Sequence, residues 1–205
     1  MRGRDIKSYT IKHENKWVIF TRRGIDIELF PSIKDHLLQY YEDLKPRKDN
    51  DTSGRKPGPY KWYEIQDNVA YYKDFDKEKI IWIELTDKPN FALDTNGYYI
   101  NNTIFFITGS KLKYLLAFLN SRLCEWYFDK IAATSGVGTR RWIKIYIDQI
   151  CVPFPDEVYE SRINSMVDLL NKNYDTKLIK ELDTEIYNMF ELSPNEIELI
   201  TNASL

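Results

Sequence analysis

The chain has 205 residues, of which 43% are hydrophobic and 15% aromatic, and its formal net charge is −2. These values are typical of a globular protein with a real core. Its longest apolar runs are far too short to span a bilayer and none follows Met1, so we expect a cytoplasmic protein with no membrane partner and no signal peptide. Two lone cysteines, Cys124 and Cys151, fit a reducing compartment and exclude a disulfide framework.

Charge is distributed in alternating blocks. Residues 1–61 carry net +5, residues 62–110 carry −4, residues 111–149 carry +4 and residues 150–205 carry −7. Random clustering on a solvated surface is one interpretation of this pattern. The other is a basic face for a polyanion, with an acidic tail turned away from it.

The first third of the chain predicts two short strands and a helix. The strands are expected at 9–13 and 16–20, where apolar and β-branched residues gather. The helix is expected to begin at Pro31 and to end before Pro46. Its apolar residues recur at helical spacing: Ile33, Leu37, Leu38, Tyr41 and Leu44.

Residues 45–61 predict a loop, because basic residues alternate with Pro, Gly, Asp and Asn and no apolar period is present. A solvated connection explains this composition. A mobile arm that meets a phosphate backbone explains it equally well. In the second interpretation the phosphate contacts come from Arg47, Lys48, Arg55, Lys56 and Lys61.

A β-rich region follows. Strands are expected at 79–85, 91–94, 98–100 and 103–108, with Asn96-Gly97 as the turn of a hairpin. The helix expected from Ser110 has a wide apolar face that reaches Tyr127, which is typical of a core helix.

A glycine-rich loop at 134–141 precedes an expected strand at 142–147 and a proline stop at Pro153. Glycines let a backbone approach a ligand closely, and arginines offer forked donors for phosphates or guanine edges. Strand alternation would place Arg140 and Lys144 on one face, so we expect a base contact from Arg140 and a phosphate contact from Lys144. The candidate groove contacts of this loop are Ser135, Thr139, Arg140 and Arg141.

After Pro155 the pattern becomes helical, with two amphipathic helices and a third that begins at Ser193, an N-cap followed by Pro194 and Glu196. The sequence therefore predicts an α+β fold. A mixed, twisted sheet with packed helices is expected to form residues 1–155, and a helical appendage is expected to form residues 156–205.

Catalytic signatures are absent from the sequence. It contains no dinucleotide fingerprint, no Walker A motif, no Gly-x-Ser-x-Gly and no Asn-Pro-Pro-Tyr or Asp-Pro-Pro-Tyr loop. The run from Asp74 through Asp76 and Glu78 to Lys79 precedes a strand and indicates a charged turn rather than a nuclease cluster. His13 and His36 lack metal-ligand spacing. On its residues alone the chain is a binding module, with no catalytic residue, metal or cofactor of its own.

Several segments together resemble a known family, the TaqI-like C-terminal specificity domains of combined restriction–modification enzymes. The resemblance extends over nearly the whole chain and depends on the order of individually weak motifs. These are Gly3-Arg4-Asp5-Ile6, Pro31 to Leu44, Lys61-Trp62-Tyr63-Glu64, Lys79-Ile80-Ile81, Leu119-Asn120-Ser121, Val152-Pro153-Phe154-Pro155 and the tail from Leu182 to Ile197. The helix, glycine-rich loop and proline stop are also similar to the recognition domains of type I specificity subunits.

This resemblance implies a reader of double-stranded DNA sequence, with residues 1–155 as the target-recognition domain. It also implies an adenine-N6 methyltransferase domain, and in some enzymes a nuclease, on the N-terminal side in the same polypeptide. Such a parent enzyme would use S-adenosylmethionine, and Mg²⁺ if it cleaves DNA. The alternative is a protein-interaction or scaffold domain without a DNA role, which the acidic helical tail and the 15 tyrosines favour.

Overall fold

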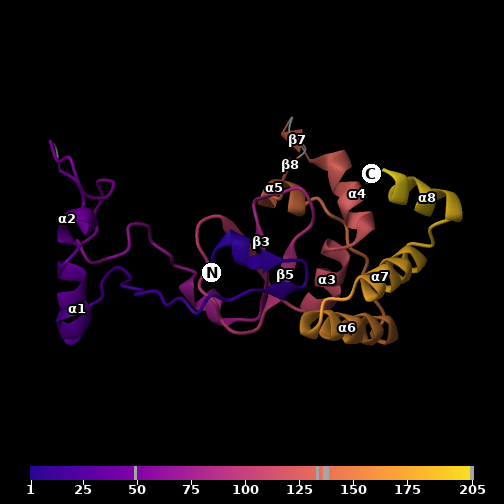
Figure 1. The fold of residues 1–205 in the computed structure, drawn as a ribbon, viewed down its shortest axis with the longest axis horizontal. Helices are drawn as coiled ribbons and strands as arrows, with labels where there is room; N and C mark the ends of the chain where they lie inside the picture. The colour runs from indigo at the N-terminus through magenta and orange to yellow at the C-terminus, as the bar shows by residue number, and fades with distance from the viewer. Residues whose placement is uncertain (49, 133, 136–138, 204–205) are drawn as a thin grey trace. The chain divides into compact units, whose positions relative to one another are not determined.

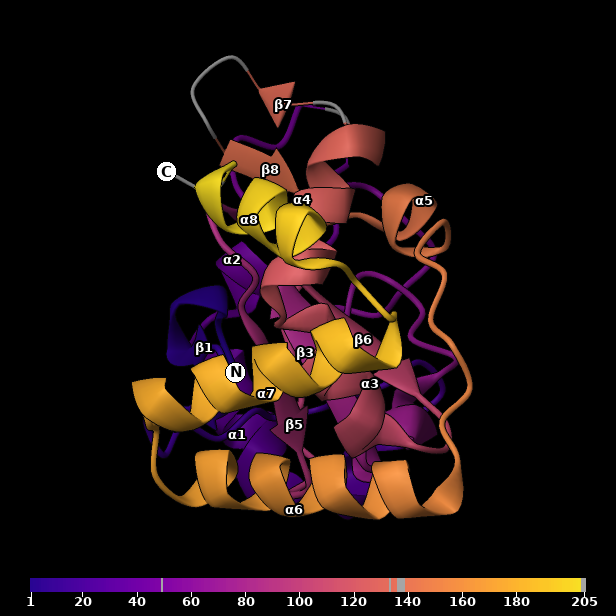
Figure 2. The same cartoon turned by 90° about the vertical axis from the view of Figure 1, so that its right-hand side faces the viewer.

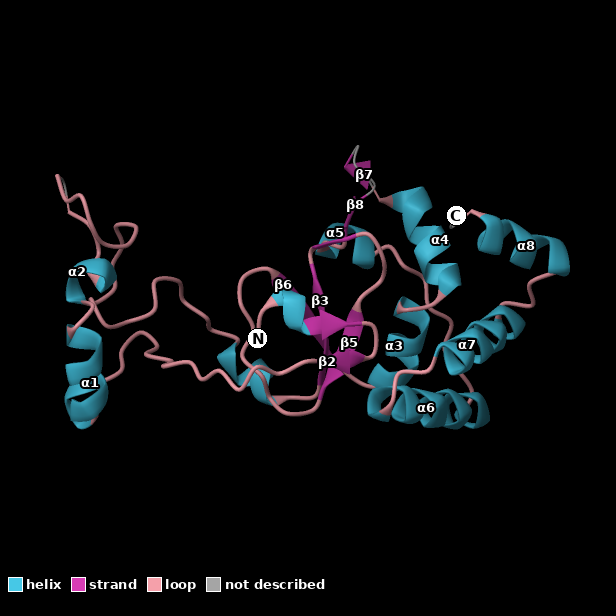
Figure 3. Cartoon of the chain, in the orientation of Figure 1, coloured by secondary structure: helices cyan, strands magenta, loops and turns pink. Residues whose placement is uncertain are grey.

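The computed structural model describes residues 1–48, 50–132, 134–135 and 139–203. The chain forms two compact units, each described by itself. The larger unit comprises residues 1–15 and 74–205, and the smaller unit comprises residues 16–73. Figure 1 labels the elements along the chain, and Figure 3 shows that the strands lie in the larger unit.

Among the described residues, three small antiparallel sheets form the β part of the larger unit. The central sheet has the order β5-β3-β6, formed by Phe91–Asp94, Lys79–Ile83 and Ile104–Thr108. A second sheet has the order β4-β8-β7, formed by Leu85–Thr86, Thr139–Arg141 and Thr134–Ser135. The third pairs β1 (Ile6–Lys7) with β2 (Thr10–Ile11), after the short 3-10 helix η1 (Gly3–Asp5). The predicted α+β class is confirmed.

Strand β3 separates two cores because its side chains alternate between the two faces of the sheet. Ile80 and Trp82 point into the main core, which the helices cover, whereas Ile81 packs with Ile6 and Ile104 on the other face. All five of these side chains are buried. The near-continuous apolar run at 79–83 is therefore explained by burial on both sides.

The helices of the larger unit are α3 (Leu112–Leu119), α4 (Arg122–Ile131), α5 (Lys144–Ile147), α6 (Glu157–Lys172), α7 (Thr176–Met189) and α8 (Pro194–Asn202). Figure 2 shows α6 and α7 side by side. Ile163 and Val167 of α6 and Leu182 of α7 lie in the main core. The predicted N-terminus of α8 is confirmed, since Ser193 and Glu196 form a reciprocal capping box.

The single helix expected from Ser110 is wrong, because the chain breaks it at Asn120. The amide of Asn120 donates to the carbonyl of Phe91 (2.9 Å) and accepts from its N–H (3.1 Å), which fixes the junction to strand β5. Ser121 then caps α4 by accepting from the N–H of Cys124 (3.1 Å). These bonds give the Asn-Ser pair a structural role.

The expected hairpin at Asn96-Gly97 is also wrong in its second strand, since residues 98–100 form no strand. The buried carboxylate of Asp94 accepts from the N–H groups of Asn96 (2.8 Å) and Tyr98 (2.9 Å), which turns the chain away from the sheet. The same carboxylate pairs with the buried ammonium of Lys79 (2.6 Å). Lys79 is therefore part of a structural ion pair, and no group of three potential metal ligands occurs among the described residues.

The smaller unit holds η2 (Ile27–Leu29), α1 (Pro31–Leu38) and α2 (Tyr41–Leu44), while η3 (Tyr72–Asp76) follows at its end. The helix expected from Pro31 is present but is split at Gln39. The strand expected at 16–20 is wrong, and Trp17 there is 92% exposed. An isolated strand cannot satisfy its backbone groups, and the described part of this unit offers no strand to pair with it.

Candidate nucleic-acid interface

In its described residues, 45–48 and 50–61, the basic segment after α2 is a loop held together by backbone hydrogen bonds. Its two arms meet where Pro46 and Arg55 form an isolated bridge. Around that bridge the N–H of Arg55 donates to the carbonyl of Lys45 (2.9 Å), and the N–H of Arg47 donates to the carbonyl of Arg55 (2.9 Å). Gly54 has φ +103°, and a Cβ there would lie 2.6 Å from the Lys45 carbonyl oxygen. Glycine is therefore required at this turn.

The guanidinium of Arg55 connects the beginning and the end of this loop. Its Nε donates to the carbonyl of Leu44 (2.6 Å) and its Nη2 to the carbonyl of Trp62 (2.9 Å). It also lies over the ring of Tyr60, 4.7 Å from the centroid. All of these contacts are within the protein, and the residue is only half-exposed.

Four of the five phosphate contacts predicted in this loop are exposed: Arg47, Lys48, Lys56 and Lys61. The ammonium of Lys61 lies 5.6 Å from the ring centroid of Tyr63. Arg47 and Lys48 form no side-chain ion pair with any described residue. The exposed charge of the loop is therefore mainly positive.

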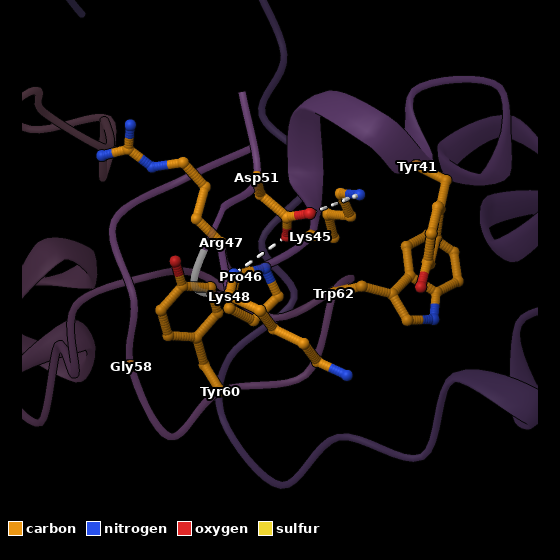
Figure 4. A pocket seen from close by; sticks show the side chains of 9 residues that line it. All are labelled: Tyr41, Lys45, Pro46, Arg47, Lys48, Asp51, Gly58, Tyr60 and Trp62. Atoms are coloured by element: carbon orange, nitrogen blue, oxygen red, sulfur yellow. Dashed lines mark hydrogen bonds and ion pairs between the residues drawn. The ribbon is translucent and has the colours of Figure 1, made fainter. Parts of the chain in front are cut away.

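The nearby carboxylate of Asp51 is occupied by other partners. It accepts from the N–H of Lys48 (2.9 Å) and lies 3.7 Å from the ammonium of Lys45, which also pairs with Glu42 (2.8 Å). The hydrogen bond from the Lys48 N–H lowers the pKa of Asp51. The charge of Lys45 lowers it further, while burial acts in the opposite direction. Figure 4 shows Asp51 directed toward Lys45 while the Arg47 side chain extends away from it.

A pocket lies on the loop and combines cations with aromatic rings. The rings of Tyr41 and Trp62 meet edge to face, 5.4 Å apart. Sequence reasoning did not assign Tyr41, Tyr60 or Trp62 to the site, although the run from Tyr60 to Tyr63 is an aromatic signal beside the basic one. The pocket is lined by Tyr41, Lys45, Pro46, Arg47, Lys48, Asp51, Gly58, Tyr60 and Trp62 (Figure 4).

The second group of candidates lies in the larger unit, on the β7–β8 hairpin. Arg140 binds the Asp129 carboxylate through Nε and Nη2 (2.7 Å for Nη2), lies 3.1 Å from Glu125 and donates to the carbonyl of Asp87. The hydrogen bond to Asp129 raises the pKa of Arg140. Burial raises the pKa of Glu125, and Arg140 opposes that shift. The guanidinium therefore faces helix α4, and its side chain is only 16% exposed.

The strand expected at 142–147 is wrong, so the alternation argument for Arg140 and Lys144 does not hold. The chain leaves β8 after Arg141 and forms helix α5, because Trp142 is drawn into the core. Its ring stacks on Phe128 with centroids 3.8 Å apart, and its backbone N–H donates to the carbonyl of Glu84 (2.7 Å). Lys144 is exposed on α5 and pairs with Asp148.

The remaining hairpin candidates are Arg141, the last residue of β8, and the Ser135–Thr139 pair beside the residues that are not described. Arg141 is exposed and its guanidinium pairs with Glu84. Ser135 pairs with Thr139 in the β7–β8 register, while the side chain of Ser135 and residues 136–138 lie outside the described part. The structure thus brings Thr139, Arg140 and Arg141 together on one strand and separates Lys144 from them.

Exposed cations on a braced loop have the chemistry that polyanion-binding proteins use for phosphate contacts. Residues 1–152 match the family model of the TaqI-like C-terminal specificity domain. The chain belongs to this family, and membership implies recognition of a DNA target in a restriction–modification context. No helix in the described ranges is long and apolar enough to cross a membrane.

Proposed function

We propose that this chain recognises a specific site on double-stranded DNA and thereby positions an adenine-N6 methyltransferase domain of the same polypeptide. The family match supports the DNA target, and the loop of exposed cations is the observation that carries the assignment of a contact surface. S-adenosylmethionine, and Mg²⁺ if the parent enzyme cleaves, would then be bound outside this chain.

We assign phosphate contacts to the exposed loop cations and base contacts to the β7–β8 hairpin. Within the hairpin, Arg141 is the better candidate for reading a base edge, because its side chain is 54% exposed whereas that of Arg140 is 16% exposed. Arg140 would hold the hairpin on α4. Lys144, on a different element, would contact a phosphate if its pair with Asp148 opens.

A salt-titrated binding experiment tests the function. Fluorescence anisotropy with a random duplex should show affinity falling about a hundredfold between 50 and 200 mM salt, as about four phosphate contacts require. Selection from a randomised duplex library should then enrich one sequence. A triple Ala variant of Arg47, Lys48 and Lys56 should bind weakly. A variant with Ala at Lys172, Lys177 and Lys180 loses the same charge from the acidic tail and should bind normally.

The same experiment addresses the alternative of a protein-interaction domain. Trp17 and Val18 are exposed apolar residues of the smaller unit, 92% and 60% accessible, which such a domain would use. A wild-type chain that shows no salt-dependent binding to duplex DNA would refute the DNA assignment and favour that alternative.

A further inference from the structure

We infer that the basic loop, described over residues 45–48 and 50–62, is a preformed site for phosphodiesters of the DNA backbone, in which Arg47 and Lys48 contact phosphates and Arg55 positions them. The inference rests on the proposed DNA-binding function and adds which cations touch the ligand. The sequence predicted a phosphate contact from Arg55 as well. In the present proposal Arg55 instead positions the two residues that make the contact.

The guanidinium donors of Arg55 are used inside the loop. Its side chain reaches two carbonyls that are 18 positions apart, those of Leu44 and Trp62, at 2.6 and 2.9 Å. A planar guanidinium can hold two such acceptors at once, whereas a lysine ammonium is a single point on a flexible stem. Trp62 in turn packs on Tyr41 of α2, so this bracing joins both ends of the loop to the helix.

These contacts of Arg55 also fix the backbone from which the Arg47 side chain projects. The N–H of Arg47 donates to the carbonyl of Arg55, and the N–H of Arg55 donates to that of Lys45, both at 2.9 Å. Any movement of Arg55 is therefore transmitted to Arg47. A site whose backbone is already ordered loses less conformational freedom when a ligand binds.

The charges around Arg47 and Lys48 favour an anionic ligand. Arg47 and Lys48 are consecutive, exposed and without an ion pair to any described residue, while Asp51 is occupied by Lys45 and the Lys48 N–H. Figure 4 shows the two side chains extending to different sides of the loop, so each would contact a different oxygen anion along an extended polyanion. A phosphodiester backbone has this chemistry, and the rings of Tyr41 and Trp62 offer an apolar surface for the adjoining sugar.

Charge-conserving variants separate the two roles. Arg47→Lys should bind random duplex DNA nearly as well as the wild type, because a point charge suffices at a phosphate. Arg47→Ala and Lys48→Ala should each weaken binding on the order of tenfold and reduce the salt slope by about 1. Arg55→Lys should weaken binding to a similar extent although no charge is lost, and should speed hydrogen exchange at the Arg47 amide. Direct phosphate contact by Arg55 would give the opposite: a mild Arg55→Lys effect and unchanged exchange.

Two glycine variants test the same positioning role in case the Arg55→Lys variant does not fold. Gly54→Ala disturbs the same bridge without touching a charge, since its Cβ would meet the Lys45 carbonyl oxygen at 2.6 Å. Gly24 also has positive φ (+81°), but a Cβ there meets nothing within 4 Å. Gly54→Ala should therefore weaken DNA binding and Gly24→Ala should not. Equal effects of the two would overturn the positioning role.

The failures of the two proposals are distinguishable. If the wild-type chain shows no salt-dependent DNA binding, the proposed function fails. If it binds DNA while Arg47→Ala and Lys48→Ala leave the salt slope unchanged, this site is wrong and DNA recognition lies elsewhere on the chain. If the two variants lose binding to a polyglutamate probe but not to DNA, the loop serves an acidic protein instead.

Discussion

The carboxylate of Asp183 on helix α7 links that helix to α4, because it accepts from the N–H of Arg122 (2.9 Å). Burial raises its pKa to about 6, against the opposing effect of the Arg122 bond and charge. Since the usual value is 3.8, the folded state holds more protons than the unfolded state between about pH 4 and pH 6. The free energy of unfolding therefore falls as pH rises through that window. Above about pH 6 the protein bears the full cost of burying the charged carboxylate.

Asp183→Asn should remove this penalty, because an amide oxygen can accept the same bond and carries no charge. Relative to the wild type, the variant should gain up to about 3 kcal/mol more stability at pH 7.5 than at pH 4. Urea unfolding of both proteins at the two pH values measures this difference. An equal change in the free energy of unfolding at both values would contradict the burial argument.

Arg140 joins the β7–β8 hairpin to α4 through its ion pairs with Glu125 and Asp129. Arg140→Ala leaves the buried carboxylate of Glu125 without this partner, so we expect a loss of about 2–3 kcal/mol, below the value for a fully buried pair because Asp129 reaches solvent. Urea unfolding measures the loss, and adding Glu125→Gln should recover part of it. Arg141→Ala, the matched control, removes an exposed pair and should cost less than about 1 kcal/mol. Equal losses would contradict the assigned roles.

The chain as a whole should not tolerate removal of its acidic tail. The family match ends at residue 152, yet Ile163, Val167, Leu170 and Leu182 beyond it are at most 1% exposed and lie in the main core. Truncation after Pro155 would expose the apolar surface of α3 that they cover. We expect the truncated chain to lose its cooperative thermal transition and to bind a hydrophobic dye. A cooperative transition within a few degrees of the wild type would show instead that residues 156–205 are a separable appendage, as the sequence suggested.

Local patterns were sufficient for the elements whose causes lie within a few residues. The apolar run at 79–83, the helical periodicity after Pro155 and the Ser193 capping box each indicated their element correctly. The basic composition of residues 45–61 likewise indicated a loop. In all of these cases spacing along the chain is itself the physical cause, through side-chain alternation, helical repeat or capping.

Long-range contacts account for what those patterns missed. Residues 142–147 alternate like a strand, but burial of Trp142 against Phe128 bends the chain into a helix. Asn120 breaks a predicted helix because it pairs with Phe91, 29 positions away in the chain. Arg140 and Arg55 look like free cations in the sequence, yet one meets carboxylates on α4 and the other meets carbonyls at both ends of its loop. The partners of a cation come from elements that folding brings beside it. These elements are distant in the sequence, so the residues next to the cation do not predict them.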